Sequence, residues 1–152
     1  MTKPQPRVIF LDAATFGDLS LERFSEAWEC TLHRVTQPAQ TISRLAGHAV
    51  AVTNKVAFDK PVFDAPQTAG LKLIAVAATG TDVIDKAAAA KHGVTVCNVP
   101  GYASQSVAQF TMALMLELAT RAGSYGADVK AGAWQKSPVY TLLTYPQVEL
   151  SG

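Results

Sequence analysis

The sequence predicts an α/β fold, a flavodoxin-like, doubly wound parallel sheet with helices on both faces. Over the first two-thirds of the chain, short apolar runs rich in valine and isoleucine alternate with stretches of helical spacing. These runs are apolar throughout, which is typical of parallel strands that are covered on both faces. In such sheets, ligands bind beyond the carboxyl ends of the strands.

Five strands and four helices are expected in turn along this region. The strands are predicted at residues 7–11, 30–35, 49–53, 71–77 and 94–98. The helices are predicted at residues 21–28, 38–47, 59–65 and 84–92. Proline early in the second and third helices, and glycine at or just after the ends of the second and fourth, fit the usual chemistry of helix ends.

The pattern changes at residues 98–101 (NVPG), and the helix that follows is of a different kind. Ser104 is expected to cap a helix over residues 105–121, the longest and most apolar in the chain. Its apolar side chains point in nearly every direction, as in a helix buried inside a larger body. Residues 122–152 are expected to be loop-like. We therefore expect a partner surface for this helix, from another chain or from residues that follow Gly152.

The composition excludes several classes of function. The chain has 152 residues, of which 49% are hydrophobic, and a net charge of +1, as in an ordinary globular protein. It has no basic stripe for nucleic acid or an anionic membrane and no apolar run long enough to span a bilayer. Cys30 and Cys97 lie far apart without metal-ligand spacing, so we expect a reduced, cytoplasmic protein without a metal.

The segment 77–82 (AATGTD) follows the fourth predicted strand at its carboxyl end. Gly80 allows the backbone to approach a ligand closely or to adopt a positive φ. Successive exposed amides can then form a concavity for a carboxylate or a phosphate. The alternative is a tight turn in which Asp82 is the N-cap of the next helix. These residues alone leave both interpretations open.

Separate segments in continuous register resemble the D-isomer-specific 2-hydroxyacid dehydrogenases. They are residues 72–82 (KLIAVAATGTD), 93–102 (GVTVCNVPGY) and 106–109 (SVAQ). Within that family the chain is most similar to the glycerate dehydrogenases, or hydroxypyruvate reductases, and residues 52–56 (VTNKV) and 132–137 (GAWQKS) fit the same subgroup. The resemblance covers nearly the whole chain.

The resemblance implies two domains. Residues 1–99 would be the N-terminal part of a flavodoxin-like substrate domain, which a C-terminal return completes. Residues 100–152 would open an inserted Rossmann cofactor domain, with a helix at 104–121 and a dimerisation loop around Trp134. Such an enzyme uses NAD or NADP on the CH–OH group of D-2-hydroxy acids, here hydroxypyruvate and D-glycerate, with glyoxylate as a further substrate. It would form a homodimer or a higher association through residues 105–121 and the Trp134 loop.

Four residues of this chain match positions that contact substrate or cofactor in the family. The backbone at Thr79 and Gly80 would hold the substrate carboxylate. Thr79 and Val107 would meet the nicotinamide end of the cofactor. Lys55 would lie near the same cleft, and the alternative for it is a solvated surface lysine.

The family's catalytic arginine, glutamate and histidine are expected beyond Gly152, and so is its glycine-rich fingerprint. No G-x-G-x-x-G occurs in the 152 residues. His33 lies near the second strand, while His48 and His92 suit helix C-termini, where a cation is favourable. The sequence therefore predicts the N-terminal part of a dehydrogenase, inactive by itself, with weak or no cofactor binding. A truncated homologue acting as a binding or assembly module, and a ligand-binding domain without chemistry, are the alternatives.

Overall fold

The computed structural model of the chain describes residues 5–151. The chain divides into two compact units, Met1–Tyr102 and Ala103–Gly152. The division lies near the Pro-Gly pair at residues 100 and 101, where the sequence pattern changes. The assignment of residues 1–99 to a substrate domain and of residues 100–152 to a cofactor domain stays a prediction.

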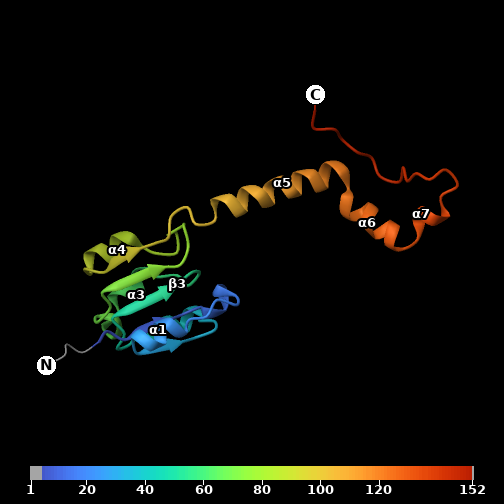
Figure 1. The fold of residues 1–152 in the computed structure, drawn as a ribbon. Helices are drawn as coiled ribbons and strands as arrows, with labels where there is room; N and C mark the ends of the chain where they lie inside the picture. The colour runs from blue at the N-terminus through green and yellow to red at the C-terminus, as the bar shows by residue number, and fades with distance from the viewer. Residues whose placement is uncertain (1–4, 152) are drawn as a thin grey trace. The chain divides into compact units, whose positions relative to one another are not determined.

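The first unit contains a five-stranded parallel sheet in the order β2-β1-β3-β4-β5 (Figure 1). Its strands are β1 (Val8–Phe10), β2 (Cys30–Leu32), β3 (Val50–Thr53), β4 (Leu73–Val76) and β5 (Thr95–Cys97). All the pairings between them are parallel. The predicted fold class is confirmed, but the edge strand β5 has exposed side chains and is not covered on both faces.

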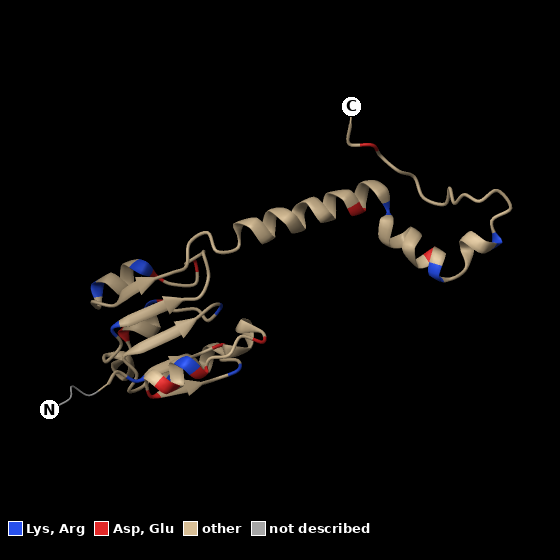
Figure 2. Ribbon diagram, viewed as in Figure 1, with Lys and Arg blue, Asp and Glu red and all other residues tan. Residues whose placement is uncertain are grey.

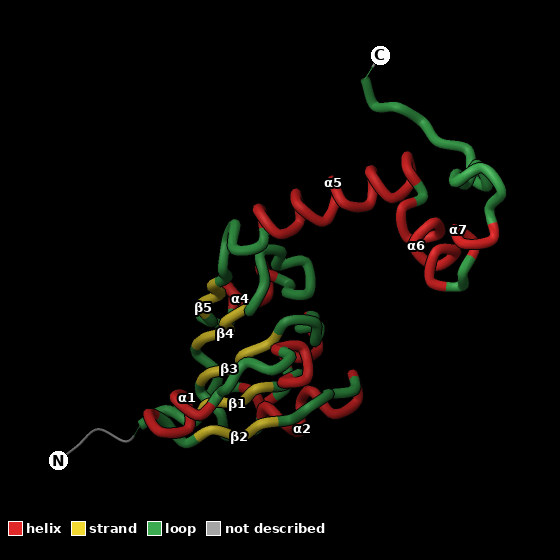
Figure 3. The backbone as a smooth tube through the Cα atoms, turned by 45° about the vertical axis from the view of Figure 1, so that its right-hand side comes forward, coloured by secondary structure: helices red, strands yellow, loops and turns green. Residues whose placement is uncertain are grey.

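Helices lie on both sides of this sheet (Figure 3). They are α1 (Glu22–Ala27), α2 (Thr41–Leu45), α3 (Lys60–Asp64) and α4 (Lys86–Lys91). Short 3-10 turns occur at η1 (Ala13–Phe16), η2 (Pro38–Gln40) and η3 (Pro66–Thr68). Parallel crossovers are right-handed, and the strand order reverses at β1, so α1 covers one face and α2, α3 and α4 cover the other.

Most elements are shorter than the sequence predicts. The helix expected at residues 38–47 is divided into η2 and α2, because Pro38 opens a tight 3-10 turn. That turn is closed by the Gln37 N–H, which donates to Gln40 Oε1 at 3.0 Å. Local hydrogen bonds of this kind decide where a helix begins, and the apolar spacing does not record them.

The hydrophobic core lies between the sheet and helices α2, α3 and α4. Strand residues that point to this face, such as Ile9, Ala51 and Ile74, have no exposed surface. They pack with Leu45 of α2 and Phe63 of α3 in one apolar cluster. Because burying a large aliphatic side chain stabilises a fold by roughly 1.5–3 kcal/mol, this layer holds the strand ends in place.

The opposite face of the sheet is covered less completely by the described residues. Over β1, Phe10 packs edge-on against Phe24 of α1, with ring centroids 5.3 Å apart. Four side chains of β3 and β4 point to this face and are only partly buried. They are Val50, Val52, Leu73 and Ala75. The central strands therefore have one complete apolar layer and one incomplete layer.

A cluster of charged side chains joins α3 to α4. The Asp64 carboxylate accepts a hydrogen bond from Lys60 Nζ and lies 3.0 Å from His92 Nε2. The hydrogen bond from Lys60, followed by that from His92, lowers the pKa of the Asp64 carboxyl below its usual value. His92 is the C-cap residue of α4, which agrees with the expected preference for a cation at that helix end.

Replacing Asp64 with asparagine is expected to reduce the loss of stability in acid. Its folded-state pKa is depressed, so ionised Asp64 stabilises the fold above the unfolded-state pKa of about 4. This contribution is lost as the pH falls through the lower folded-state value. Urea midpoints at about pH 7 and about pH 3 should differ less for Asp64→Asn than for the wild type. The control Glu26→Gln, at an exposed position of α1, should keep the wild-type difference.

The second unit is helical, with α5 (Ser104–Thr120), α6 (Ala122–Lys130) and α7 (Ala133–Lys136). The expected long helix is confirmed, but its N-cap is Ala103, and Ser104 is its first residue. The prediction of a loop over residues 122–152 is wrong for residues 122–136. Arg121 adopts a left-handed conformation with φ of 56°, which ends α5 and allows α6 to begin.

Two contacts stabilise the end of this unit. The Glu117 carboxylate accepts a hydrogen bond from the Gly123 N–H at 2.9 Å. It thereby provides an acceptor for an N–H group in the first turn of α6, which has no partner within the helix. The Tyr125 hydroxyl donates to the Tyr145 carbonyl at 3.0 Å, and the two rings pack edge-on.

Glu117 is also the one charged residue within α5 (Figure 2). Among residues 5–151, no helix has the length and apolarity that a membrane crossing needs.

Candidate functional site at the carboxyl edge of the sheet

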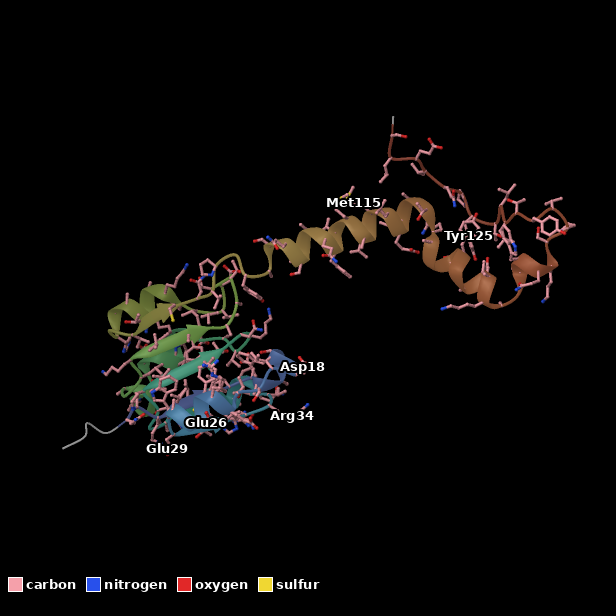
Figure 4. All side chains as sticks on the ribbon, viewed as in Figure 1. Asp18, Glu26, Glu29, Arg34, Met115 and Tyr125 are labelled. Atoms are coloured by element: carbon pink, nitrogen blue, oxygen red, sulfur yellow. The ribbon has the colours of Figure 1, made fainter. Side chains whose placement is uncertain are left out.

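The candidate site is formed by loops that leave the carboxyl ends of the parallel strands. Asp18 and Arg34, which follow β1 and β2, lie at this end of the sheet, whereas Glu29 precedes β2 at the other (Figure 4). In a parallel sheet all such loops emerge at one edge, so residues far apart in the chain meet there.

The loop after β4, which contains Thr79 and Gly80, is tied to its neighbours on both sides. Toward β3, the Ala77 N–H donates to the Thr53 carbonyl at 2.7 Å. Toward β5, Asn98 Nδ2 donates to the Thr79 carbonyl at 2.7 Å, and the Thr79 hydroxyl donates to the Val99 carbonyl at 3.1 Å. The carbonyl and hydroxyl groups of Thr79 are therefore occupied.

Three successive N–H groups of the same loop have no acceptor in the described part of the chain. Within the described part of the chain, the amides of Thr79, Gly80 and Thr81 donate to no protein acceptor. Successive free amides can donate hydrogen bonds to a small anion. Gly80 is not among the glycines with positive φ, so of its two expected roles only the close approach of the backbone to a ligand stays a prediction. Its small size, and not a special backbone conformation, leaves the amides accessible.

The alternative interpretation of this loop, a tight turn in which Asp82 caps the next helix, is not supported. The N-cap of α4 is Asp85, whose Oδ1 accepts from the Ala88 N–H at 2.9 Å, and not Asp82. Asp82 instead places its Oδ2 3.2 Å from the position that a Cβ on Gly80 would occupy. This negative charge beside the free amides means that an anion bound there needs a cation nearby.

Lys55, the candidate cation, lies on the loop after β3, which is anchored by Asp12. The buried Asp12 carboxylate accepts from the Asn54 N–H at 2.9 Å and from the Lys55 N–H at 2.6 Å. The Thr53 hydroxyl also donates to it, at 3.3 Å. The Lys55 side chain is exposed, and across residues 5–151 it forms no ion pair.

Two cavities border this loop. One, of about 360 Å³, is lined by residues that include Asp12, Arg34, Thr41 and Lys55. The other, of about 310 Å³, is lined by Thr15, Phe16, Leu19, Asn54, Ala77, Val99 and Tyr102. Thr79 and Gly80 line neither cavity, although the second contains their neighbour Ala77. The structure thus brings Lys55 together with Arg34 and leaves the amides of Thr79 and Gly80 on the adjacent loop.

Each cavity is bordered by a residue with an unsatisfied polar atom. Thr41 Oγ1 and Asn54 Oδ1 are buried, and neither has a hydrogen-bond partner within residues 5–151. A buried polar atom without a partner costs free energy in the native state. Asn54, Arg34 and Asp12 are not among the site residues that the sequence predicts. Asp12 has a visible signal, because it directly follows the apolar run at residues 8–11.

Val107, His48 and His92 belong to other segments of the chain, whereas His33 directly follows β2. Val107 belongs to the second unit, on α5, and 60% of its surface is exposed. His48 is buried, with its ring nitrogens 3.1 Å from the Ala46 carbonyl and 3.2 Å from Thr31 Oγ1. Burial, followed by Arg44 and His48, lowers the pKa of His33. In the described residues, no three His, Cys, Asp or Glu side chains gather as metal ligands do.

Comparison with known protein families identifies the family of this chain. The family described as D-isomer specific 2-hydroxyacid dehydrogenase, catalytic domain, matches residues 8–149. The chain belongs to the D-isomer-specific 2-hydroxyacid dehydrogenase family. This confirms the resemblance predicted from residues 72–82 and 93–102. In this dehydrogenase family member, the matched region includes both the sheet and most of the helical unit.

Several relatives of this chain are known by name. The chain is 37% identical over 153 residues to the glycerate dehydrogenase of Methylorubrum extorquens, a match that covers 100% of this chain and 47% of that protein. It is 30% identical over 151 residues to the hydroxypyruvate reductase of Blautia hydrogenotrophica, covering 96% and 46%. The chain thus spans about half the length of the curated relatives it matches.

Solved structures show the same fold. The TT0316 protein of Thermus thermophilus has a TM-score of 0.77 at 27% identity, over 96% of this chain and 46% of that one. A glyoxylate/hydroxypyruvate reductase of Sinorhizobium meliloti, solved with NADP and malonate, has a TM-score of 0.74 at 19% identity, over 97% and 44%. The fold of this dehydrogenase family member therefore agrees with that of solved proteins over nearly its whole length.

Proposed function

We propose that the chain is the N-terminal, substrate-binding part of an NAD(P)-dependent oxidoreductase that acts on the CH–OH group of D-2-hydroxy acids. The row of free amides at Thr79, Gly80 and Thr81, at the carboxyl edge of the sheet, carries this proposal. Hydroxypyruvate and D-glycerate are the proposed substrate pair, with glyoxylate as a further substrate. Relatives named glycerate dehydrogenase and hydroxypyruvate reductase support this choice.

The substrate carboxylate is the group that these residues recognise. Amides that have no protein acceptor can donate to a carboxylate in short, charge-assisted hydrogen bonds. Lys55 supplies a positive charge from the loop after β3, which offsets the repulsion from Asp82. The backbone and this cation together orient the acid end of the substrate and leave its C2 carbon free for reaction.

The cofactor proposal concerns the nicotinamide end only. When bound, NAD or NADP accepts or donates the hydride. Thr79 lies exposed at the carboxyl edge, and Val107 offers an exposed apolar side chain for a flat ring. The chain has no glycine-rich phosphate loop, so we propose weak or no cofactor binding by these residues alone. The catalytic arginine, glutamate and histidine are not assigned to any residue of this chain.

The proposed architecture follows the family. Residues 1–99 form the N-terminal part of the substrate domain, and residues 100–152 begin the cofactor domain. The partly covered side chains of β3 and β4 support this, because a returning segment of the substrate domain would complete that layer. The exposed apolar surface of α5 supports a homodimer or a higher association that also involves the Trp134 region. The proposed location is the cytoplasm.

The purified chain is expected to bind D-glycerate with a Kd of about 1 mM or weaker, because so small a ligand makes few contacts. It is expected to leave NADH and NADPH unoxidised when hydroxypyruvate is added. Calorimetry or an NMR titration measures the first result, and absorbance of the reduced cofactor measures the second. Glycerol, which has no carboxylate, is the control ligand.

The outcomes separate the two parts of this proposal. Sustained turnover in a clean preparation would show that the chain holds its own catalytic groups. Absence of D-glycerate binding, or equal binding of glycerol, would contradict the proposed carboxylate site. A role as an assembly module is the second candidate function, and the exposed apolar side chains of α5 favour it.

A further inference from the structure

Asp12 is the most extensively hydrogen-bonded side chain at the candidate site. Asp12 lies at the end of β1, beside the end of β3, and only 5% of its surface is exposed. Its carboxylate accepts from the backbone N–H groups of Asn54 and Lys55, at 2.9 Å and 2.6 Å. These contacts join parts of the chain that are 42 and 43 residues apart. Such bonds to a carboxylate are stronger than bonds to a neutral acceptor.

Thr53 extends this anchor to the next residue of the loop. Its hydroxyl donates to Asp12 Oδ2 at 3.3 Å and accepts from the Val56 N–H at 3.1 Å. The amides of three successive residues, Asn54, Lys55 and Val56, are therefore held directly or through one hydroxyl. The loop that carries Lys55 is fixed before any ligand arrives.

Within residues 5–151, the ammonium group of Lys55 has no ion-pair partner. Asp12 and Lys55 border one cavity, yet they form no ion pair within the described chain. The carboxylate instead accepts from backbone N–H groups and from one hydroxyl. A lysine paired with that carboxylate would present less net charge to an incoming anion.

We propose that Asp12 is a positioning residue, which holds the loop after β3 so that Lys55 faces the substrate carboxylate. This inference rests on the proposed function, because it gives Lys55 a substrate to meet. An ordered loop binds a ligand more tightly than a mobile one, since less conformational entropy is lost on binding. Asp12 does not touch the substrate, and its effect passes through Lys55.

Binding of D-glycerate to four forms of the chain tests the proposal. They are the wild type, Asp12→Asn, Lys55→Met and the double variant. Each single substitution is expected to weaken binding roughly tenfold, the scale of one charge-assisted hydrogen bond. The double variant should bind no more weakly than Lys55→Met, because a positioning residue has no effect once the residue it positions is removed. Asp18→Asn is the matched control, since Asp18 is an exposed carboxylate in the loop after the same strand, and it should bind as the wild type does.

The amide NMR spectrum gives a second readout that needs no ligand. The Asn54 and Lys55 amide protons should resonate downfield in the wild type and exchange slowly with solvent, although the loop lies at the surface. In Asp12→Asn both signals should move upfield and exchange faster, while amides of β4 such as Ile74 stay protected. If Asp12→Asn does not fold, the exchange rates of the wild-type amides still decide whether the anchor exists.

Each result has a defined meaning. Additive losses in the double variant would overturn the positioning role, and wild-type exchange at the rate of an unfolded peptide would overturn the anchor itself. If the wild type binds D-glycerate and the cycle is additive, the inference fails while the proposed function stands. If the wild type does not bind D-glycerate at all, the proposed function fails, and the role of Asp12 toward a substrate fails with it.

Discussion

Replacing Gly80 with valine is expected to abolish measurable binding of D-glycerate while the fold stays intact. Gly80 does not need a positive φ, so the backbone accepts a side chain there. A Cβ would meet only the far end of the Asp82 side chain, at 3.2 Å, and this end can move. The branched side chain would nevertheless cover the adjacent free amides. The loss of two charge-assisted hydrogen bonds corresponds to a decrease in affinity of about a hundredfold.

An NMR titration with D-glycerate measures this effect, and the thermal midpoint checks the fold. Gly80→Ala should weaken binding less than Gly80→Val, because a methyl group covers less of the amides. Gly70→Ala is the control, since Gly70 also lies outside the left-handed region and a Cβ there would meet only the His48 carbonyl, at 3.9 Å. Unchanged affinity in a folded Gly80→Val protein would remove these amides from the proposed site.

Placing two glutamates on α5, in Leu114→Glu/Leu118→Glu, is expected to convert an associated chain into a monomer. These side chains lie four residues apart on one face of the helix and are 49% and 66% exposed. Burying each leucine in an interface contributes roughly 1.5–3 kcal/mol, whereas burying an unpaired carboxylate there is strongly unfavourable. The combined effect should weaken association by at least about a thousandfold.

Sedimentation velocity over a range of concentrations measures this change. The matched control is Gln105→Glu/Gln109→Glu, which adds the same charge at the same spacing on the same helix but removes no apolar side chain. The control should associate as the wild type does. A wild-type chain that stays monomeric at high concentration would contradict both the homodimer and the assembly module.

Much of the fold could be predicted from the sequence, because buried strands of a parallel sheet have continuous apolar sequences. The runs at residues 7–11, 49–53 and 71–77 correspond to β1, β3 and β4. The helix ends were less predictable, since they depend on single hydrogen bonds such as that between Gln37 and Gln40. Helix α6 was missed because Gly123 and Gly126 lower the helix propensity of its sequence.

The candidate site was predictable only in part. The loop with Thr79 and Gly80 could be located because a small-residue segment directly follows a buried strand. The role of Asp12 could not be predicted, since its partners Asn54 and Lys55 lie 42 and 43 residues later in the chain. The cavity that Arg34 shares with Lys55 likewise depends on two loops that are distant in sequence.

The sequence by itself determined the family, the parallel sheet and the position of the small-residue loop after β4, because these depend on composition and spacing within short segments. Tertiary structure decided that the Asp12 carboxylate accepts hydrogen bonds from the backbone of the Lys55 loop, and that Lys55 has no carboxylate partner within the described residues. The strand order places β1 beside β3, and this contact depends on the chain's path through space, which local sequence patterns do not record.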